Sequence, residues 1–456
     1  SGYLHMNHVE LVKAPGSEQA KLIEFARSDP ATYQLSVICN RHFPDRKEAP
    51  KGTWTRDEEG RLITGKGESV DGTAWGGNER LVISPEAPDE LSEMMARGRA
   101  EPIAALREYA PISIVLNGGE YGIGVFGFAG AKWKRDPRIL EAKGDQRWID
   151  YISSRKARQE KIISDRVRDA AGDPDAYVYY QVQAGGDWNR YGHYWKWSSA
   201  QFSDLHVISD YASAAMYYKH WNSGFVGKQD MLTKRLNGIE VERKHGRPLA
   251  YHWFWGGMQK KNVDLTRYHG MIKMVYITGC VGGNAGNYDN SAKPDSFDPA
   301  GSDFQYYKEM IALARVHALF THLDDHILNG DLLPGEHAHP WSRDRMAYEF
   351  LPEELAGEIE LIDSKPRTAL PPGRSVRVIV RKHRDQPEWL VGAWAAAGPA
   401  RSATITIPDA GRVTLEARPG GSTYIVRRNE DGLDVHLCDP DEQYPSRSFI
   451  PPPWWN

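Results

Sequence analysis

Cysteine is scarce in this sequence, and its few cysteines form no metal-binding pattern. The 456 residues include only Cys39, Cys280 and Cys438, with no CxxC pair among them. Because zinc sites place cysteines or histidines at short, fixed spacings, the sequence predicts no metal site. Cys39 and Cys280 lie within or at the end of apolar runs, so we expect buried thiols rather than nucleophiles.

Long apolar runs and basic runs are also missing. No apolar stretch reaches the roughly 18–20 residues that span a bilayer, so we expect no membrane segment. The net charge is −4 and no Lys/Arg run stands out, which argues against a nucleic-acid partner. No signal peptide is visible, and Ser1–Met6 resembles an expression remnant. We therefore expect a secreted or periplasmic protein whose export signal has been removed.

Three catalytic fingerprints are absent. No GxGxxG turn follows an early strand, so a dinucleotide-binding fold is disfavoured and no cofactor is predicted. No GxSxG elbow is present, which disfavours acyl transfer. The run HLDDH places His322 and His326 on one helix face but is not an HExxH motif. We expect Asp324, Asp325 and the two histidines to be solvated or to cap a helix.

Strand-like and helix-like segments alternate up to about residue 330. The expected strands are Tyr33–Cys39, Ile112–Leu116, Tyr177–Gln183, Leu205–Ser209, Leu249–Trp255 and Lys273–Gly279, with a weaker one at Tyr3–His8. The expected helices are Ser17–Arg27, Pro88–Glu108, Gln146–Ala170, Lys228–His245 and Asp303–Leu328. This alternation indicates a parallel sheet of the α/β class. We predict a (β/α)8 TIM barrel over residues 1–355, with an eighth strand near Leu81–Ile83 or upstream of the given start.

The composition changes after about residue 360. Short alternating runs follow Pro371-Pro372-Gly373 at roughly 10-residue spacing, which is typical of antiparallel sandwiches. They are Ser375–Arg381, Trp389–Trp394, Ala403–Ile407, Arg412–Ala417 and Ser422–Val426. We therefore predict a small antiparallel β-sandwich with a Pro/Trp tail over residues 356–456.

Carboxylates follow several expected strands. Ile112–Gly122 is a buried-strand pattern that ends in Asn117, two glycines and Glu120. Asp210 directly follows Leu205–Ser209, and Asp187 lies in a glycine-rich stretch after Tyr177–Gln183. Because chemistry in α/β barrels sits at the carboxyl ends of the strands, Glu120, Asp210 and Asp187 are the candidate catalytic residues. The alternatives are a turn carboxylate for Glu120, a helix cap for Asp210 and an Asx-turn for Asp187.

Aromatic residues are abundant and suggest a sugar ligand. The chain has 15 Trp and 22 Tyr, several of them in glycine-rich or basic surroundings. Indole planes stack on the apolar faces of pyranose rings, whereas the simpler explanation for half of these residues is core packing. The candidate substrate contacts are Asn117, Tyr121, Trp75, Trp188, Arg190, His193, Trp195, His252, Trp253, Trp255 and Asn284. For His252, a buried core position is an equal alternative.

The overall plan resembles glycoside hydrolases that combine a catalytic (β/α)8 barrel with a C-terminal β-sandwich. The resemblance rests on the Asn117–Glu120 strand end, the aromatic loops and the passage from a last helix through Leu332-Leu333-Pro334 into all-β sequence. It implies two carboxylates that flank a glycosidic bond. Glu120 would protonate the leaving oxygen, and Asp210 or Asp187 would attack the anomeric carbon or activate water. The expected substrate is a polysaccharide, with anionic or sulfated glycans as candidates because Arg190 and Lys196 interleave the aromatics.

Two other functions remain open at this point. A polysaccharide lyase acting on a uronate could use Tyr191, His193 and Arg190, and its product would be unsaturated. A non-catalytic carbohydrate-binding protein could keep the barrel without chemistry.

Overall fold

The computed structural model describes most of the chain. The described residues are 3–30, 33–39, 47–66, 79–117, 131–179, 210, 212–217, 232, 235–236, 249–255, 265–286, 302–335, 348–355, 376–396 and 398–439.

Seven of the described strands run parallel. Four form a sheet in the order β1 (Tyr3–His5), β2 (Ser36–Cys39), β5 (Ile114–Asn117) and β6 (Ala176–Tyr179). Three more, β7 (Ala212–Tyr217), β8 (Ala250–Trp255) and β9 (Cys280–Gly286), form a second sheet. The parallel α/β class predicted from the sequence is confirmed, and closure into a (β/α)8 barrel stays a prediction.

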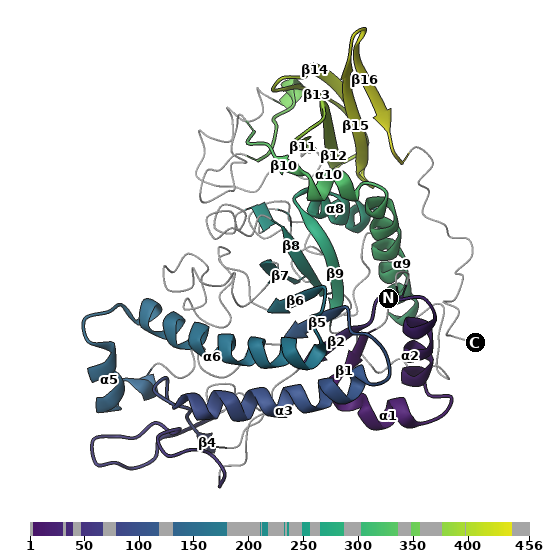
Figure 1. Cartoon of the computed structure of the whole chain (residues 1–456). Coiled ribbons are helices and arrows are strands. Elements are labelled where there is room, and N and C mark those ends of the chain that lie inside the picture. Colours follow the sequence, from purple (N-terminus) through teal and green to yellow (C-terminus); the bar gives the residue numbers. More distant parts are fainter. Residues whose placement is uncertain are drawn as a thin grey trace.

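Long helices cover the first sheet. α3 (Asp89–Arg107) and α6 (Trp148–Ala171) lie side by side beneath it (Figure 1). The shorter helices α1 (Val9–Lys13) and α2 (Glu18–Ser28) lie near the edge strand β1. The predictions for α2, α3 and α6 are confirmed within two residues at each end. Ser17 caps α2, as expected, because its hydroxyl accepts a hydrogen bond from the Ala20 amide at 3.0 Å.

One predicted strand is wrong. Lys273–Gly279 was expected to be a strand, but Leu265–Ile277 forms helix α8 and the strand β9 begins at Cys280. Every residue from Tyr268 to Ile277 is buried. A helix that is buried on all sides has no polar stripe, so a short apolar run within it looks the same as a buried strand. The predicted helix Asp303–Leu328 is also divided, into α9 (Ser302–Thr321) and α10 (Asp324–Leu328).

The C-terminal part is antiparallel. A five-stranded sheet has the order β10 (Gly330–Leu332), β11 (Val376–His383), β12 (Glu388–Ala395), β15 (Ser422–Asn429) and β16 (Gly432–Leu437). A hairpin of β13 (Arg401–Ile407) and β14 (Gly411–Ala417) shares a core with it. The five predicted strands are confirmed, whereas β16 was not foreseen. Because β10 pairs with β11, this sheet reaches back to Gly330, ahead of the predicted boundary at residue 356.

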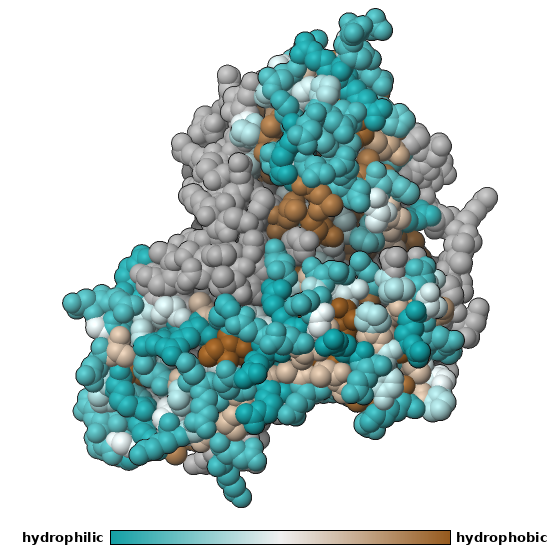
Figure 2. Space-filling view, viewed as in Figure 1, coloured by the Kyte–Doolittle hydropathy of each residue, from teal (hydrophilic) through white to brown (hydrophobic). Residues whose placement is uncertain are grey.

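One hydrophobic cluster joins the helices α8 and α9 to the C-terminal sheet. Buried residues of α8 and α9 pack in one cluster with Ile379, Leu390, Trp394 and Ile425 of the antiparallel sheet. Figure 2 shows apolar residues gathered at the level of α8, between hydrophilic surfaces above and below. Within the described residues, no helix has both the length and the apolar character needed to cross a bilayer.

A buried ion pair lies at the same junction. Lys273 of α8 contacts Asp439 at 2.5 Å (Nζ to Oδ2), and Arg418 contacts the other carboxylate oxygen at 2.8 Å. His269 lies one turn before Lys273. Burial and the charges of Lys273, Arg315 and Arg418 lower the pKa of His269 to about 2. The imidazole is therefore neutral in the folded protein at any ordinary pH.

This lowered pKa predicts a loss of stability on mild acidification. The unfolded chain binds the His269 proton near pH 6.5, whereas the folded chain binds it only near pH 2, so the unfolded state holds more protons in between. By pH 5.5 the free energy of unfolding should fall by about 1.4 kcal/mol relative to pH 8 through this one group. Urea denaturation of His269→Gln should lack this component. His436→Gln, which replaces an exposed imidazole, is the control, and equal pH slopes for wild type and His269→Gln would contradict the prediction.

Candidate active site

The strand β5 ends in a buried polar cluster around Asn117. The Asn117 side-chain oxygen accepts a hydrogen bond from Arg99 of α3 at 3.0 Å. Its amide nitrogen donates to Glu160 of α6 at 2.9 Å and to the Tyr177 hydroxyl of β6 at 2.8 Å. Asn117 has no exposed surface, and both of its N–H groups are used. We call Arg99, Asn117, Glu160 and Tyr177 the Asn117 cluster.

This arrangement corrects the expectation for Asn117. The sequence analysis predicted that its side chain contacts the substrate. In the structure, that side chain is hydrogen-bonded to other side chains of the protein. The Asn117 cluster ties the end of β5 to α3, α6 and β6. Its role is therefore to hold the strand end from which the chain continues to Glu120.

Burial shifts the pKa values of several groups in and beside the cluster. Lys156 pairs with Glu160 at 2.6 Å, and both side chains are buried. Burial lowers the pKa of Lys156 against the opposing effect of Glu160, and burial raises the pKa of Tyr177 well above its ordinary value. Cys39, which lies in register with Asn117, has its pKa raised to about 12 by burial. This agrees with the expectation of a buried, unreactive thiol.

Asp210 lies at the amino edge of the sheet rather than at a carboxyl end. Its backbone amide donates to the Tyr177 carbonyl at 2.9 Å, and its carboxylate accepts from the Tyr177 amide at 2.6 Å. Arg168, at the end of α6, donates to both carboxylate oxygens at 2.9 and 3.1 Å. The strand that follows, β7, begins only at Ala212. The sequence analysis expected Asp210 at a carboxyl end, whereas its carboxylate lies beside the start of β6 and is bound by Arg168 and the Tyr177 amide.

His252 is enclosed within the protein. The residue is fully buried in the middle of β8, and burial together with the Arg235 charge lowers its pKa well below the ordinary value. The structure therefore favours a buried core position for His252 over a substrate contact. Trp253, Trp255 and Asn284 have described backbones only, and Trp253 lies in register with Asn284 across β8 and β9.

The remaining candidates lie outside the described residues. They are Glu120, Asp187, Tyr121, Trp75, Trp188, Arg190, His193 and Trp195, together with Tyr191 of the lyase hypothesis. The expected strand Leu205–Ser209 also lies outside them.

The HLDDH run contributes polar contacts to the C-terminal sheet. Asp325 accepts hydrogen bonds from Asn329 at 2.6 Å and from His383 at 3.1 Å, and His326 contacts Glu388 at 3.1 Å. Asp324 and Asp325 lie in the first turn of α10, where carboxylates interact favourably with the helix dipole. Across the residues that the structure describes, no three His, Cys, Asp or Glu side chains are arranged to hold a metal ion.

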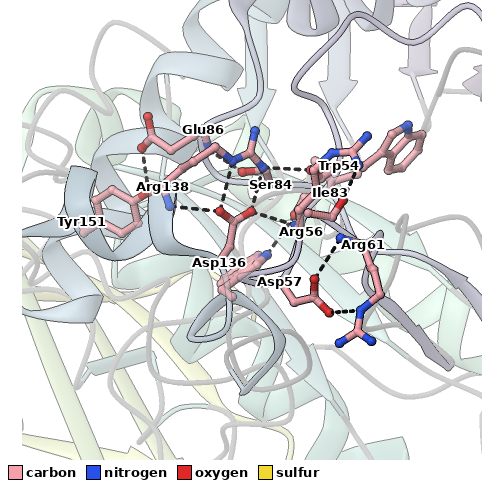
Figure 3. A network of polar contacts seen from close by, with 12 residues as sticks. Trp54, Arg56, Asp57, Arg61, Ile83, Ser84, Glu86, Asp136, Arg138 and Tyr151 are labelled. Atoms are coloured by element: carbon pink, nitrogen blue, oxygen red, sulfur yellow. Dashed lines mark hydrogen bonds and ion pairs between the residues drawn. The ribbon is translucent and has the colours of Figure 1, made fainter.

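A second polar network, which includes the buried carboxylate of Asp136, links two long βα connections (Figure 3). The β2–α3 connection contains the hairpin of β3 (Thr64–Lys66) and β4 (Glu79–Leu81), and the β5–α6 connection contains α5 (Pro137–Lys143). Asp136, which caps α5, accepts from the Arg56 amide at 2.8 Å and from Arg138 at 2.7 Å. We call residues 47–66, 79–88 and 131–147 the β3–β4 lobe.

Sequence reasoning missed the residues that hold these networks together. Arg99 and Glu160 are charged residues within long helices, and nothing local distinguishes them from solvated positions. Asp136 could have been predicted as a helix cap. Asp is a favoured N-cap residue, and Pro137 after it is favoured at the first position of a helix. That signal identifies the cap, but not the hydrogen bond to a residue 80 positions away.

Comparisons with known proteins give distant structural likenesses only. No protein-family model and no curated protein sequence matches the chain. The fold is similar to an α-amylase from H. orenii (9% identity, 89% of this chain and 82% of that chain, TM-score 0.47). It is also similar to an α-amylase from Geobacillus thermoleovorans complexed with acarbose (10% identity, 90% and 80%, TM-score 0.44). A third is a β-L-arabinopyranosidase from Geobacillus stearothermophilus in complex with arabinose (10%, 91% and 78%, TM-score 0.39).

These solved structures fall in the class that the sequence resembles, the glycoside hydrolases. All of them are about 10% identical to the chain, with TM-scores below 0.5. This is a distant likeness of chain trace, and no activity follows from it.

The position of Asp210 predicts a stability role. Asp210→Asn removes the carboxylate that accepts hydrogen bonds from Arg168 and from the Tyr177 amide. The free energy of unfolding, measured by urea denaturation, should therefore fall by about 1–2 kcal/mol. Asp165→Asn, on the same helix as Arg168, removes an exposed ion pair with Lys161 and should change stability by less than about 0.5 kcal/mol. Equal stabilities for the two variants would contradict the assignment.

Proposed function

We propose that this protein is a glycoside hydrolase that cleaves a polysaccharide by a two-carboxylate mechanism. Glu120 is the general acid and Asp187 is the second carboxylate, because Asp210 is committed to Arg168 and the Tyr177 amide. The proposal includes a closed (β/α)8 barrel as the catalytic fold.

The pairing of β5 with β6 is the observation that carries this proposal. The two strands are parallel neighbours, and Asn117 lies in register with Tyr179. The chain reaches Glu120 three residues after Asn117, which keeps the two Cα atoms within roughly 11 Å of each other. Asp187 follows Tyr179 by eight residues. The segments that contain the two carboxylates therefore begin at adjacent carboxyl ends of one sheet, where (β/α)8 enzymes place their chemistry.

The Asn117 cluster supports the same assignment. A general acid must hold its proton at the leaving oxygen, and small displacements of such a group are costly to the rate. The buried hydrogen bonds of Asn117 fix the strand end three residues before Glu120. Such an anchor suits a catalytic loop better than a solvated turn.

The chemistry follows the general scheme of glycoside hydrolysis. Glu120 protonates the glycosidic oxygen as the bond to the anomeric carbon breaks, and Asp187 attacks that carbon or activates water. A separation of roughly 5–5.5 Å between the carboxyl groups gives retention, and roughly 6.5–9.5 Å gives inversion. Aromatic residues in Trp188–Trp197 would stack on sugar rings, and Arg190 and Lys196 favour an anionic or sulfated glycan.

Replacement of Glu120 tests the proposal. Glu120→Gln should lower turnover by roughly 10²–10⁴-fold without loss of stability, because the amide cannot give up a proton. Turnover is measured as new reducing ends on neutral, uronate-rich and sulfated polysaccharides, with absorbance of unsaturated products followed in parallel. Glu430→Gln, an exposed site in the turn between β15 and β16, is the matched control and should keep full activity.

The other outcomes have defined meanings. Near-normal activity of Glu120→Gln removes Glu120 from the mechanism. Unsaturated products indicate a lyase and move attention to Tyr191, His193 and Arg190. Saturable binding of a polysaccharide without any product indicates a carbohydrate-binding protein.

A further inference from the structure

The strand β16 is the last strand of the five-stranded C-terminal sheet. Among the described residues it pairs on one side only, with β15, and Figure 1 shows it at the outer edge of that sheet. The strand at the opposite edge, β10, has three residues and contacts the helix α10. β16 has six residues and pairs with β15 without a bulge, so it offers a regular edge to another strand.

The hydrogen-bonding pattern shows which backbone groups β16 turns outward. The Cys438 amide donates to the Thr423 carbonyl at 2.8 Å, so these two residues form a hydrogen-bonded pair of the antiparallel ladder. Such pairs alternate along a ladder, and the even-numbered residues from 432 to 438 therefore face β15. Leu433, Val435 and Leu437 consequently turn their N–H and C=O groups toward the outer edge of the sheet.

The side chains of β16 leave this edge open to pairing. Natural sheets protect exposed edges with lysine, proline, bulges or a covering element, and the sequence of β16 contains neither lysine nor proline. Val435, at the centre of the strand, exposes 37% of its surface although it is apolar. Leu433 and Leu437 pack against the core of the C-terminal sheet, which holds the strand in place. An exposed β-branched residue at the centre of an ordered edge favours pairing with another strand.

The sequence of β16 is complementary to itself. From Leu433 to Leu437, apolar residues alternate with Asp434 and His436, and Val435 lies in the middle. If two such strands pair antiparallel around a two-fold axis at Val435, Asp434 of each copy lies opposite His436 of the other. An imidazole N–H can donate to a carboxylate, and unlike pairs that lie directly opposite each other stabilise a sheet.

Other registers of the same two strands are disfavoured. The outward backbone groups of the two copies must meet, so the two-fold axis can pass through residue 434, 435 or 436. An axis at Asp434 would place two carboxylates opposite each other. An axis at His436 would place two imidazoles opposite each other and would shorten the ladder. The axis at Val435 uses the full strand and places each carboxylate beside an imidazole.

We propose that β16 is an interaction surface for a second copy of this chain, and that the two strands pair antiparallel to form one continuous sheet. The two-fold axis passes through Val435, and Asp434 of each copy contacts His436 of the other. This is strand addition at a sheet edge with the isologous symmetry that is commonest among homodimers. A pair of six-residue strands buries less than the roughly 1,600 Å² of a standard interface, so we expect reversible dimers at about 10–100 µM protein.

Sedimentation velocity of the full chain, from about 1 to 200 µM, tests this pairing. The sedimentation coefficient of the wild type should rise with concentration toward that of a dimer. Val435→Pro removes an outward N–H but no hydrogen bond to β15, so it should keep the fold and weaken dimerisation at least about tenfold. Val435→Thr keeps the N–H and the β-branched shape, and it should dimerise within about threefold of the wild type.

A reciprocal exchange tests the register and does not depend on the proline variant. Asp434→His and His436→Asp, made singly, each place like side chains opposite each other and should weaken dimerisation at least about fivefold. Both positions are exposed in the single chain, so the fold should tolerate these changes. The double variant restores an unlike pair in reverse order and should regain most of the affinity. A loss that the double variant does not reverse would overturn the proposed register.

Hydrogen exchange of the peptide that contains β16 identifies what occupies the edge. The Leu433 and Leu437 amides should exchange more slowly as the wild-type concentration rises, and Val435→Pro should abolish this dependence. Equal protection at all concentrations in a monomeric chain would mean that another segment of the same chain covers the edge, which overturns the proposal. A dimer that persists unchanged in Val435→Pro, or a wild type that stays monomeric without protection of these amides, overturns it as well.

Discussion

The structure depends on the need of buried polar groups for partners. The buried amide of Asn117 is hydrogen-bonded to the Arg99 guanidinium and to the Glu160 carboxylate at the end of β5, which lowers the cost of burying all three groups. Arg99, Glu160 and Tyr177 come from three different elements, so satisfying Asn117 fixes α3, α6 and β6 relative to β5. The cluster thereby joins β5 to one neighbouring strand and to the two long helices that cover the sheet.

The same principle operates at the junction with the C-terminal sheet, where Lys273 and Asp439 share a buried contact. Apolar packing of α8 against Leu390 and Trp394 provides most of the stabilisation at this junction. The buried ion pair mainly restricts the orientation in which α8 and the sheet pack. The polar pairs thus specify the orientation of α8 on the C-terminal sheet, whereas the apolar residues stabilise the packing between them. One of the hydrophobic clusters therefore contains residues of both α8 and the C-terminal sheet.

Local signals allowed much of the fold to be predicted. The cap at Ser17, the long amphipathic patterns of α3 and α6, and the alternating C-terminal strands all depend on neighbouring residues. The errors came from long-range contacts. Lys273–Gly279 looked like a strand because its helix is buried on all sides, and Asp210 looked catalytic because its partner Arg168 lies 42 positions away. The candidate site could be located only by strand order, and Asp136 only by its bridge to Arg56.

The close approach of Gly270 to Gly421 has a consequence for the history of the chain. A β-carbon on Gly270 would meet the Trp394 indole nitrogen at 2.5 Å, and one on Gly421 would meet the Gly270 α-carbon at 2.9 Å. Gly421 also has a φ of +73°, which side-chain-bearing residues rarely adopt. Any side chain at position 270 would therefore require the Trp394 indole to move. A relative in which α8 packs against the C-terminal sheet at another angle should therefore be released from the steric requirement for glycine at position 270, whereas the backbone conformation still favours glycine at position 421.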